Sequence, residues 1–143
     1  MQQEFSRSFD QLNDIVAFTE QVFTDQGIDP STRYVVDLCV EELFVNMVTY
    51  DTETDRDILI EMNACPGGVE VSLTDYGVER FDPRNAGTVD VDAPLEQRTP
   101  GGLGLFLVLK MVDSIHYEYR DRNSKITFVA RSKEETEEHN VSD

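Results

Sequence analysis

The feature that most constrains the fold is a helical segment from Asp29 to about Val48 that is apolar around most of its surface. Asp29-Pro30-Ser31 supplies the cap and first-turn chemistry that begins a helix. Its apolar residues face nearly every direction of a 3.6-residue repeat: Val35, Val36, Leu38, Cys39, Val40, Leu43, Phe44, Val45 and Met47. Such a helix is largely buried, and we expect it to lie against a sheet.

Two polar residues interrupt this apolar helix. Glu42 and Asn46 are spaced i, i+4, so they share one face. A carboxylate and an amide on a buried face need partners. One interpretation is a local pair that hydrogen-bonds a neighbouring strand. The other is a site with one general base and one metal ligand, since an amide oxygen suits Mg²⁺.

The remaining periodicity predicts an α+β domain. An amphipathic helix is expected over 9–26, with Gly27 as its stop signal. Strands are expected over 5–9, 57–64, 69–75, 116–122 and 125–131, with a hairpin turn at 66–68. Together these elements predict a two-layer α/β sandwich, in which an antiparallel or mixed sheet carries helices on one face.

A glycine cluster forms a second candidate site. Residues 100–104 break regular structure, and an apolar segment with helical spacing follows through Leu105 to Val112. A glycine-rich turn at a helix N-terminus can hold phosphate through free backbone N–H groups and the helix dipole. The alternative is a plain loop-to-helix junction. The long aperiodic segment 81–100 precedes the glycines, and we expect it to be a lid over a ligand, with Arg98 as the nearest cation.

The strand over 69–75 ends at Asp75, directly before Tyr76 and Gly77. An acidic residue there, followed by a glycine that permits close backbone approach, is suited to hydrogen-bond the edge of a base. An ordinary Asx turn is the alternative.

Composition limits the classes of function. The chain has 143 residues and a net charge of -17, so we expect one domain over 1–132 and a disordered acidic tail over 133–143. This charge excludes a general nucleic-acid binder and argues against an anionic membrane surface. The two cysteines have no metal-type spacing, and neither a signal peptide nor a membrane span is visible. We therefore expect a cytoplasmic protein.

Three short motifs follow one another along the chain. The first is Glu42-Leu43-Phe44-Val45-Asn46, and the second is Asp75-Tyr76-Gly77 followed by Phe81-Asp82-Pro83. The third is Pro100-Gly101-Gly102-Leu103-Gly104-Leu105. They resemble the N-box and the two glycine boxes of the gyrase, heat-shock chaperone, histidine kinase and mismatch-repair ATPase superfamily, which has the Bergerat nucleotide-binding fold. Within it, the chain resembles the small anti-sigma factor serine kinases of bacterial partner-switching modules. The resemblance extends from the first helix to the last strand.

The resemblance implies a role for each motif residue. Glu42 would be the general base, Asn46 would bind Mg²⁺ and with it ATP, and Asp75 would bond the adenine amino group beside Gly77. The other implied ATP-binding residues belong to the lid and the second glycine box: Arg98, Gly101, Gly102, Leu103, Gly104 and Leu105.

The resemblance also implies an activity. The chain would be an ATP- and Mg²⁺-dependent protein serine/threonine kinase. It would phosphorylate a small STAS-type anti-anti-sigma protein and alternately sequester a sigma factor or another output protein, commonly as a homodimer. The alternatives are a catalytically weak module of the same fold that acts by sequestration alone, and a structural domain with accidental motifs.

The sequence departs from the family pattern at the rim of the base pocket and just after the N-box. Glu79 stands where relatives usually have a second glycine, and residues 47–52 lack the histidine that usually follows the N-box. Three residues also separate Gly77 from Phe81, where relatives typically have two. These departures predict a changed pocket rim and a lower affinity for ATP.

Overall fold

The computed structural model describes residues 1–79 and 110–132, and one of its two layers is a five-stranded sheet. Its strands are β1 (Gln2–Phe5), β2 (Ile58–Cys65), β3 (Gly68–Tyr76), β4 (Ser114–Arg120) and β5 (Asn123–Arg131). They are ordered β1-β2-β3-β5-β4, and every neighbouring pair is antiparallel. The sheet within the described residues is therefore antiparallel rather than mixed.

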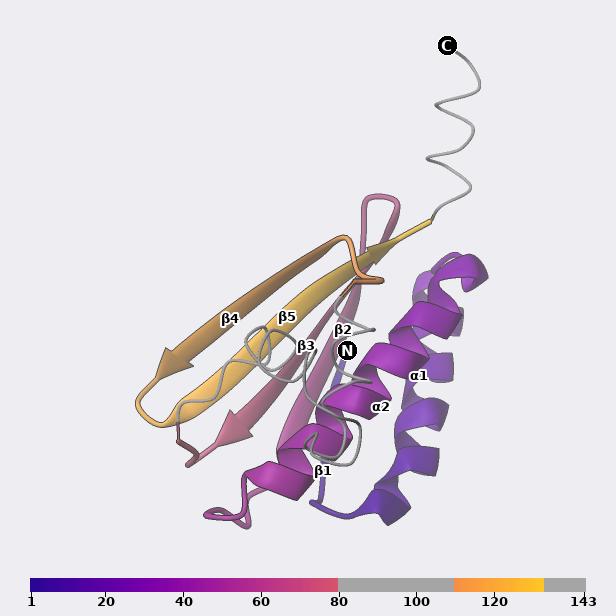
Figure 1. Ribbon diagram of the computed structural model, residues 1–143. Helices are drawn as coiled ribbons and strands as arrows, with labels where there is room; N and C mark the ends of the chain where they lie inside the picture. Colours follow the sequence, from indigo (N-terminus) through magenta and orange to yellow (C-terminus); the bar gives the residue numbers. More distant parts are fainter. Residues whose placement is uncertain (80–109, 133–143) are drawn as a thin grey trace, which may run out of the picture.

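Two helices cover one face of this sheet (Figure 1). They are α1 (Leu12–Gln26) and α2 (Arg33–Tyr50), and the short 3₁₀ turns η1 (Phe9–Gln11) and η2 (Pro30–Thr32) precede them. Asp29 caps η2, since its carboxylate accepts a hydrogen bond from the Ser31 N–H at 2.9 Å. The predicted two-layer α+β architecture is confirmed.

The core lies between the helices and the sheet, as the alternation of apolar and polar residues along the strands requires. In β2 from Ile58 to Met62 and in β3 from Val69 to Asp75, every second side chain faces the helices and is buried. The buried apolar residues of these strands and of α2 include Ile58, Ile60, Met62, Val69, Val71, Leu73, Val36, Cys39, Val40, Leu43 and Phe44. This packing explains why α2 is apolar around so much of its surface.

The first strand differs from the sequence-based prediction. The alternation suggested a strand over 5–9, but β1 ends at Phe5, and Phe9 begins η1 with a side chain that is 55% exposed. Ser8 caps that turn, because its hydroxyl accepts a hydrogen bond from the Asp10 N–H at 3.2 Å. A local cap and the pairing of residues 2–5 with β2 thus override the apolar pattern.

The second hairpin is also shifted. β4 begins at Ser114 rather than at 116, and β4 and β5 are joined by Asp121 and Arg122, both with positive φ. Residues 110–113 form turns and bends, although the sequence pattern extended a helix to Val112. The rest of that predicted helix, the predicted lid over 81–100 and the predicted tail lie outside the described residues. In the described part, no helix has the length and apolar character that crossing a membrane requires.

Candidate active site

The two polar residues of α2 lie on its last turns, at one end of the sheet. Asn46 is buried, with 8% of its surface exposed, and Glu42 lies one turn earlier and is half-buried. One helical turn places them about 6 Å apart along the helix axis. Burial raises the pKa of the Glu42 carboxyl, and the neighbouring charge of Glu41 raises it further. A raised pKa brings a carboxylate closer to the range in which it works as a general base.

Asp75 lies near the carboxyl end of β3, on the face that the helices cover. It continues the alternating series of Val71 and Leu73, and it is completely buried. Its carboxylate accepts no hydrogen bond from a backbone N–H of the described residues, so the structure does not show the Asx turn that the sequence left open.

The partner of Asp75 is Arg7, which lies between β1 and η1. The two side chains form an ion pair, and that of Arg7 is only 10% exposed. Arg7 also donates hydrogen bonds to the carbonyl oxygens of Met47 at 3.2 Å and Arg56 at 3.0 Å. A single guanidinium therefore reaches both Asp75 and the residue that follows Asn46. This contact brings the ends of α2 and β3 together, as a site built from both motifs requires.

Acidic residues surround this guanidinium. Burial lowers the pKa of Arg7, while the charges of Asp51, Glu53 and two further acidic residues of the 51–57 loop act in the opposite direction. Burial also raises the pKa of Asp51 to about 6, together with repulsion from Glu53, although Arg7 partly offsets this. Arg7 thus also compensates the negative C-terminal end of α2, whose last turn contains no basic residue.

Gly77 and the two residues after it are held by hydrogen bonds. Gly77 has a φ of 71°, a conformation that side chains disfavour, and a Cβ there would lie 3.4 Å from the Thr54 hydroxyl oxygen. The Val78 N–H donates to the Arg122 carbonyl at 2.8 Å, and the Glu79 N–H donates to the Glu53 carboxylate at 2.7 Å. The chain after Asp75 is therefore fixed between the β4–β5 hairpin and the acidic loop.

The structure thus brings part of the predicted site together. Asn46 lies near the end of α2 and Glu42 lies one turn before it, while Asp75 lies near the end of β3 and Gly77 follows that strand. The other predicted ATP-binding residues lie outside the described residues: Arg98, Gly101, Gly102, Leu103, Gly104 and Leu105. Sequence reasoning missed Arg7, because its contacts to residues 47, 56 and 75 are all long-range and no local pattern marks them.

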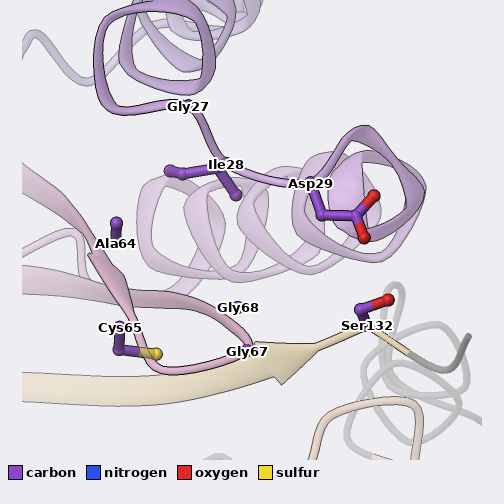
Figure 2. Close-up of a pocket in the computed structure, with 8 residues that line it drawn as sticks. All are labelled: Gly27, Ile28, Asp29, Ala64, Cys65, Gly67, Gly68 and Ser132. Carbon is purple, nitrogen blue, oxygen red and sulfur yellow. The ribbon is translucent and has the colours of Figure 1, made fainter. Parts of the chain in front are cut away.

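Two cavities lined by described residues lie near the opposite end of α2. Figure 2 shows one of about 220 Å³, between the end of α1, the β2–β3 turn and Ser132. The other, of about 350 Å³, lies beside Tyr34 and Arg131. Gly68 lines the first cavity and is seven residues from Asp75 along β3, which corresponds to roughly 23 Å. Neither cavity therefore belongs to the site at Asp75.

Comparisons with known proteins agree with this fold. A family model described as the histidine kinase-like ATPase domain matches residues 5–130. No curated protein matches the sequence. Among solved structures, the chain is similar to the RsbU and RsbW domains of Rv1364c from Mycobacterium tuberculosis, with a TM-score of 0.60 and 16% identity. That similarity covers 92% of this chain and 32% of the other, so the chain spans about a third of the length of that protein.

Proposed function

Because the chain belongs to the histidine kinase-like ATPase family, we propose that it is an ATP- and Mg²⁺-dependent protein serine kinase of the partner-switching type. One observation carries the proposal: the ends of α2 and β3, with Asn46 and Asp75, meet at one guanidinium. This shared contact of Met47, which follows Asn46, and Asp75 supports a single site for the metal and the base, although the two motif residues are 29 positions apart in the sequence.

The chemistry would be phosphoryl transfer from ATP to a serine hydroxyl. Glu42 would accept the hydroxyl proton while the serine oxygen forms a bond to the γ-phosphorus. The bond from that phosphorus to the β,γ-bridging oxygen would break, and ADP would leave with the electron pair. Positioning and neutralisation of charge supply most of the catalysis in such a reaction. The half-buried position of Glu42, which raises its pKa, supports its role as base.

Asn46 fits the metal that this chemistry needs. Within residues 1–79 and 110–132, no group of three or more His, Cys, Asp or Glu residues is placed to hold a metal ion. Mg²⁺ in nucleotide sites commonly takes only one or two protein ligands and uses phosphate and water oxygens for the rest. A buried amide oxygen at Asn46 suits that pattern. When bound, the ion would neutralise charge on the phosphates.

The partners belong to the proposal as well. The substrate would be a serine of a small STAS-type anti-anti-sigma protein, and the alternative partner would be a sigma factor or another output protein. The net charge of -17 favours a partner with a basic surface. The RsbW domain in the similar structure supports this assignment at the level of the fold. A homodimer, which the resemblance to the anti-sigma factor kinases implies, is also part of the proposal.

A specific observation favours the second candidate function, sequestration without catalysis. Arg7 already neutralises Asp75, and Glu79 replaces the usual glycine of the pocket rim. A protein with this site would bind ATP weakly and act through its surface. The two functions differ in whether the protein transfers phosphate to a partner, and a protein that binds no ATP can act only by sequestration.

Calorimetry of ATP binding, with and without Mg²⁺, tests the proposal. We expect binding that depends on Mg²⁺ in the unaltered protein and is weakened about tenfold or more by Asn46→Ala, because the amide ligand is lost. Gln21→Ala, on the exposed side of α1, is the matched control and should bind normally. Absence of binding in the unaltered protein would refute the kinase and favour sequestration.

A further inference from the structure

Arg7 is placed to influence which base the site accepts. Its guanidinium uses three different groups: Nε donates to the Arg56 carbonyl, Nη1 donates to the Met47 carbonyl, and Nη2 pairs with the Asp75 carboxylate. The contacts join the N-terminal segment, α2, the loop before β2, and β3. The planar guanidinium fork can serve several acceptors at once, as a lysine ammonium cannot in the same geometry.

The pair with Asp75 differs from the surface ion pairs of this protein. Arg33 and Asp37 also pair, at 3.0 Å, but both remain partly exposed. The Asp75 side chain has no exposed surface, and neither of its oxygens accepts a hydrogen bond from another described residue. The cation therefore supplies the main compensation for a buried negative charge.

We infer that Arg7 is a specificity-determining residue, which pairs with Asp75 and competes for this carboxylate with the amino group of an adenine base. The inference rests on the proposed function, in which Asp75 binds that amino group. With Asp75 fully buried and paired, a base has no open acceptor there until Arg7 withdraws. After the exchange, Arg7 keeps its two carbonyl partners, so the released guanidinium is not left without hydrogen bonds.

This exchange has a consequence for affinity. A neutral amino group replaces a cationic donor at the carboxylate, so the exchange gives up the attraction between two opposite charges in a buried place. ATP binding is therefore weaker than it would be without Arg7. Discrimination between bases is also affected, since a base that offers a carbonyl oxygen in place of the amino group gains nothing at Asp75 and would be repelled by it.

The test compares ATP with inosine triphosphate, which has a carbonyl oxygen where adenine has its amino group. Binding of each, with Mg²⁺, is measured by calorimetry in the unaltered protein, in Arg7→Met and in Arg33→Met. We expect Arg7→Met to tighten ATP binding about tenfold and inosine triphosphate binding much less. Arg33→Met removes a partly exposed cation from the first residue of α2, at the end opposite Asn46, and should change neither affinity.

Arg7→Met leaves a buried carboxylate without its cation, so a measurement on the unaltered protein accompanies it. The Arg7 Nε–H signal in a ¹⁵N NMR spectrum, assigned with Arg7→Lys, reports the surroundings of the whole guanidinium, including its pairing with Asp75. Saturation with ATP should shift this signal, and inosine triphosphate should shift it less. A signal that stays unchanged at saturation with ATP would overturn the inference.

The outcomes separate the inference from the proposed function. One outcome is that the unaltered protein binds ATP in a way that depends on Asn46, while Arg7→Met changes the affinities for ATP and for inosine triphosphate by the same factor. In that case Arg7 has only a structural role, and the inference alone fails. If ATP binds only after Arg7 is replaced, the inference holds and the unaltered protein acts by sequestration. If neither protein binds a nucleotide, both fail.

Discussion

Glu41 and Glu42 are adjacent in the sequence but lie in different surroundings. Glu41 is exposed, whereas Glu42 is half-buried on the face of α2 that also bears Asn46. Burial raises the pKa of the Glu42 carboxyl. A difference of one position, about 100° around a helix, therefore separates a proposed general base from a solvent-facing carboxylate.

This contrast gives a matched pair of variants. We expect Glu42→Gln to keep ATP binding and to slow phosphoryl transfer to a STAS-type substrate by roughly 10²–10⁴-fold, the usual contribution of a general base. Glu41→Gln removes the same charge without removing the base and should transfer at nearly the normal rate. The measurement is transfer of ³²P from ATP. Equal rates in the two variants would contradict the assignment of Glu42.

At the scale of elements, the loop between α2 and β2 concentrates negative charge beside the site. Four acidic residues lie within seven positions of this loop: Asp51, Glu53, Asp55 and Asp57. Their charges all act on the guanidinium of Arg7. Glu53 accepts the Glu79 N–H, and this bond lowers the pKa of Glu53. Asp51 is partly buried instead, and its raised pKa shows that its charge is unfavourable in the folded protein.

Asp51→Asn should therefore stabilise the protein at neutral pH. The pKa of Asp51 rises from 3.8 to about 6 on folding, so its contribution to stability is full below pH 3.8 and is lost as the pH rises through 6. After allowance for solvent screening, we expect a gain of roughly 1 kcal/mol at pH 7.5 that disappears toward pH 4.5.

Urea unfolding at the two pH values measures this difference. Asp55→Asn, which removes an exposed charge of the same loop, is the control and should show a smaller gain at pH 7.5. A gain for Asp51→Asn that is the same at both pH values would show that its charge is not the cause.

At the scale of the whole molecule, the net charge of -17 on 143 residues opposes the folded state. Two ion pairs of the sheet are exposed or partly exposed: Lys125–Glu61, between β5 and β2, at 3.8 Å, and His116–Glu118, within β4, at 3.3 Å. Pairs of this kind contribute little to stability. The repulsion is therefore offset mainly by the apolar core between the helices and the sheet.

Added salt should stabilise this protein. Raising NaCl from 20 mM to 500 mM shortens the Debye length below about 5 Å and screens the self-repulsion. We expect the midpoint of thermal unfolding to rise by roughly 3–5 °C, which corresponds to about 1 kcal/mol for a domain of this size. KCl at equal ionic strength should have the same effect. An unfolding midpoint that falls with salt would mean that favourable ion pairs dominate.

Much of the fold was predictable because its determinants are local. The alternation of Ile58, Ile60 and Met62 gives a strand one apolar face, and the apolar circumference of α2 requires a cover. The same periodicity failed at Phe9, where the Ser8 cap and pairing of residues 2–5 decide the backbone. Long-range pairing of this kind leaves no repeat in the sequence.

The sequence by itself determined the layers of this protein and the motif residues Glu42, Asn46, Asp75 and Gly77, since periodicity and motif order are properties of the chain. Only the tertiary structure decided that Asp75 is fully buried and paired with Arg7, 68 positions earlier. The physical reason is that a buried carboxylate requires a compensating charge, but nothing in the local sequence specifies which distant cation lies beside it in the folded protein.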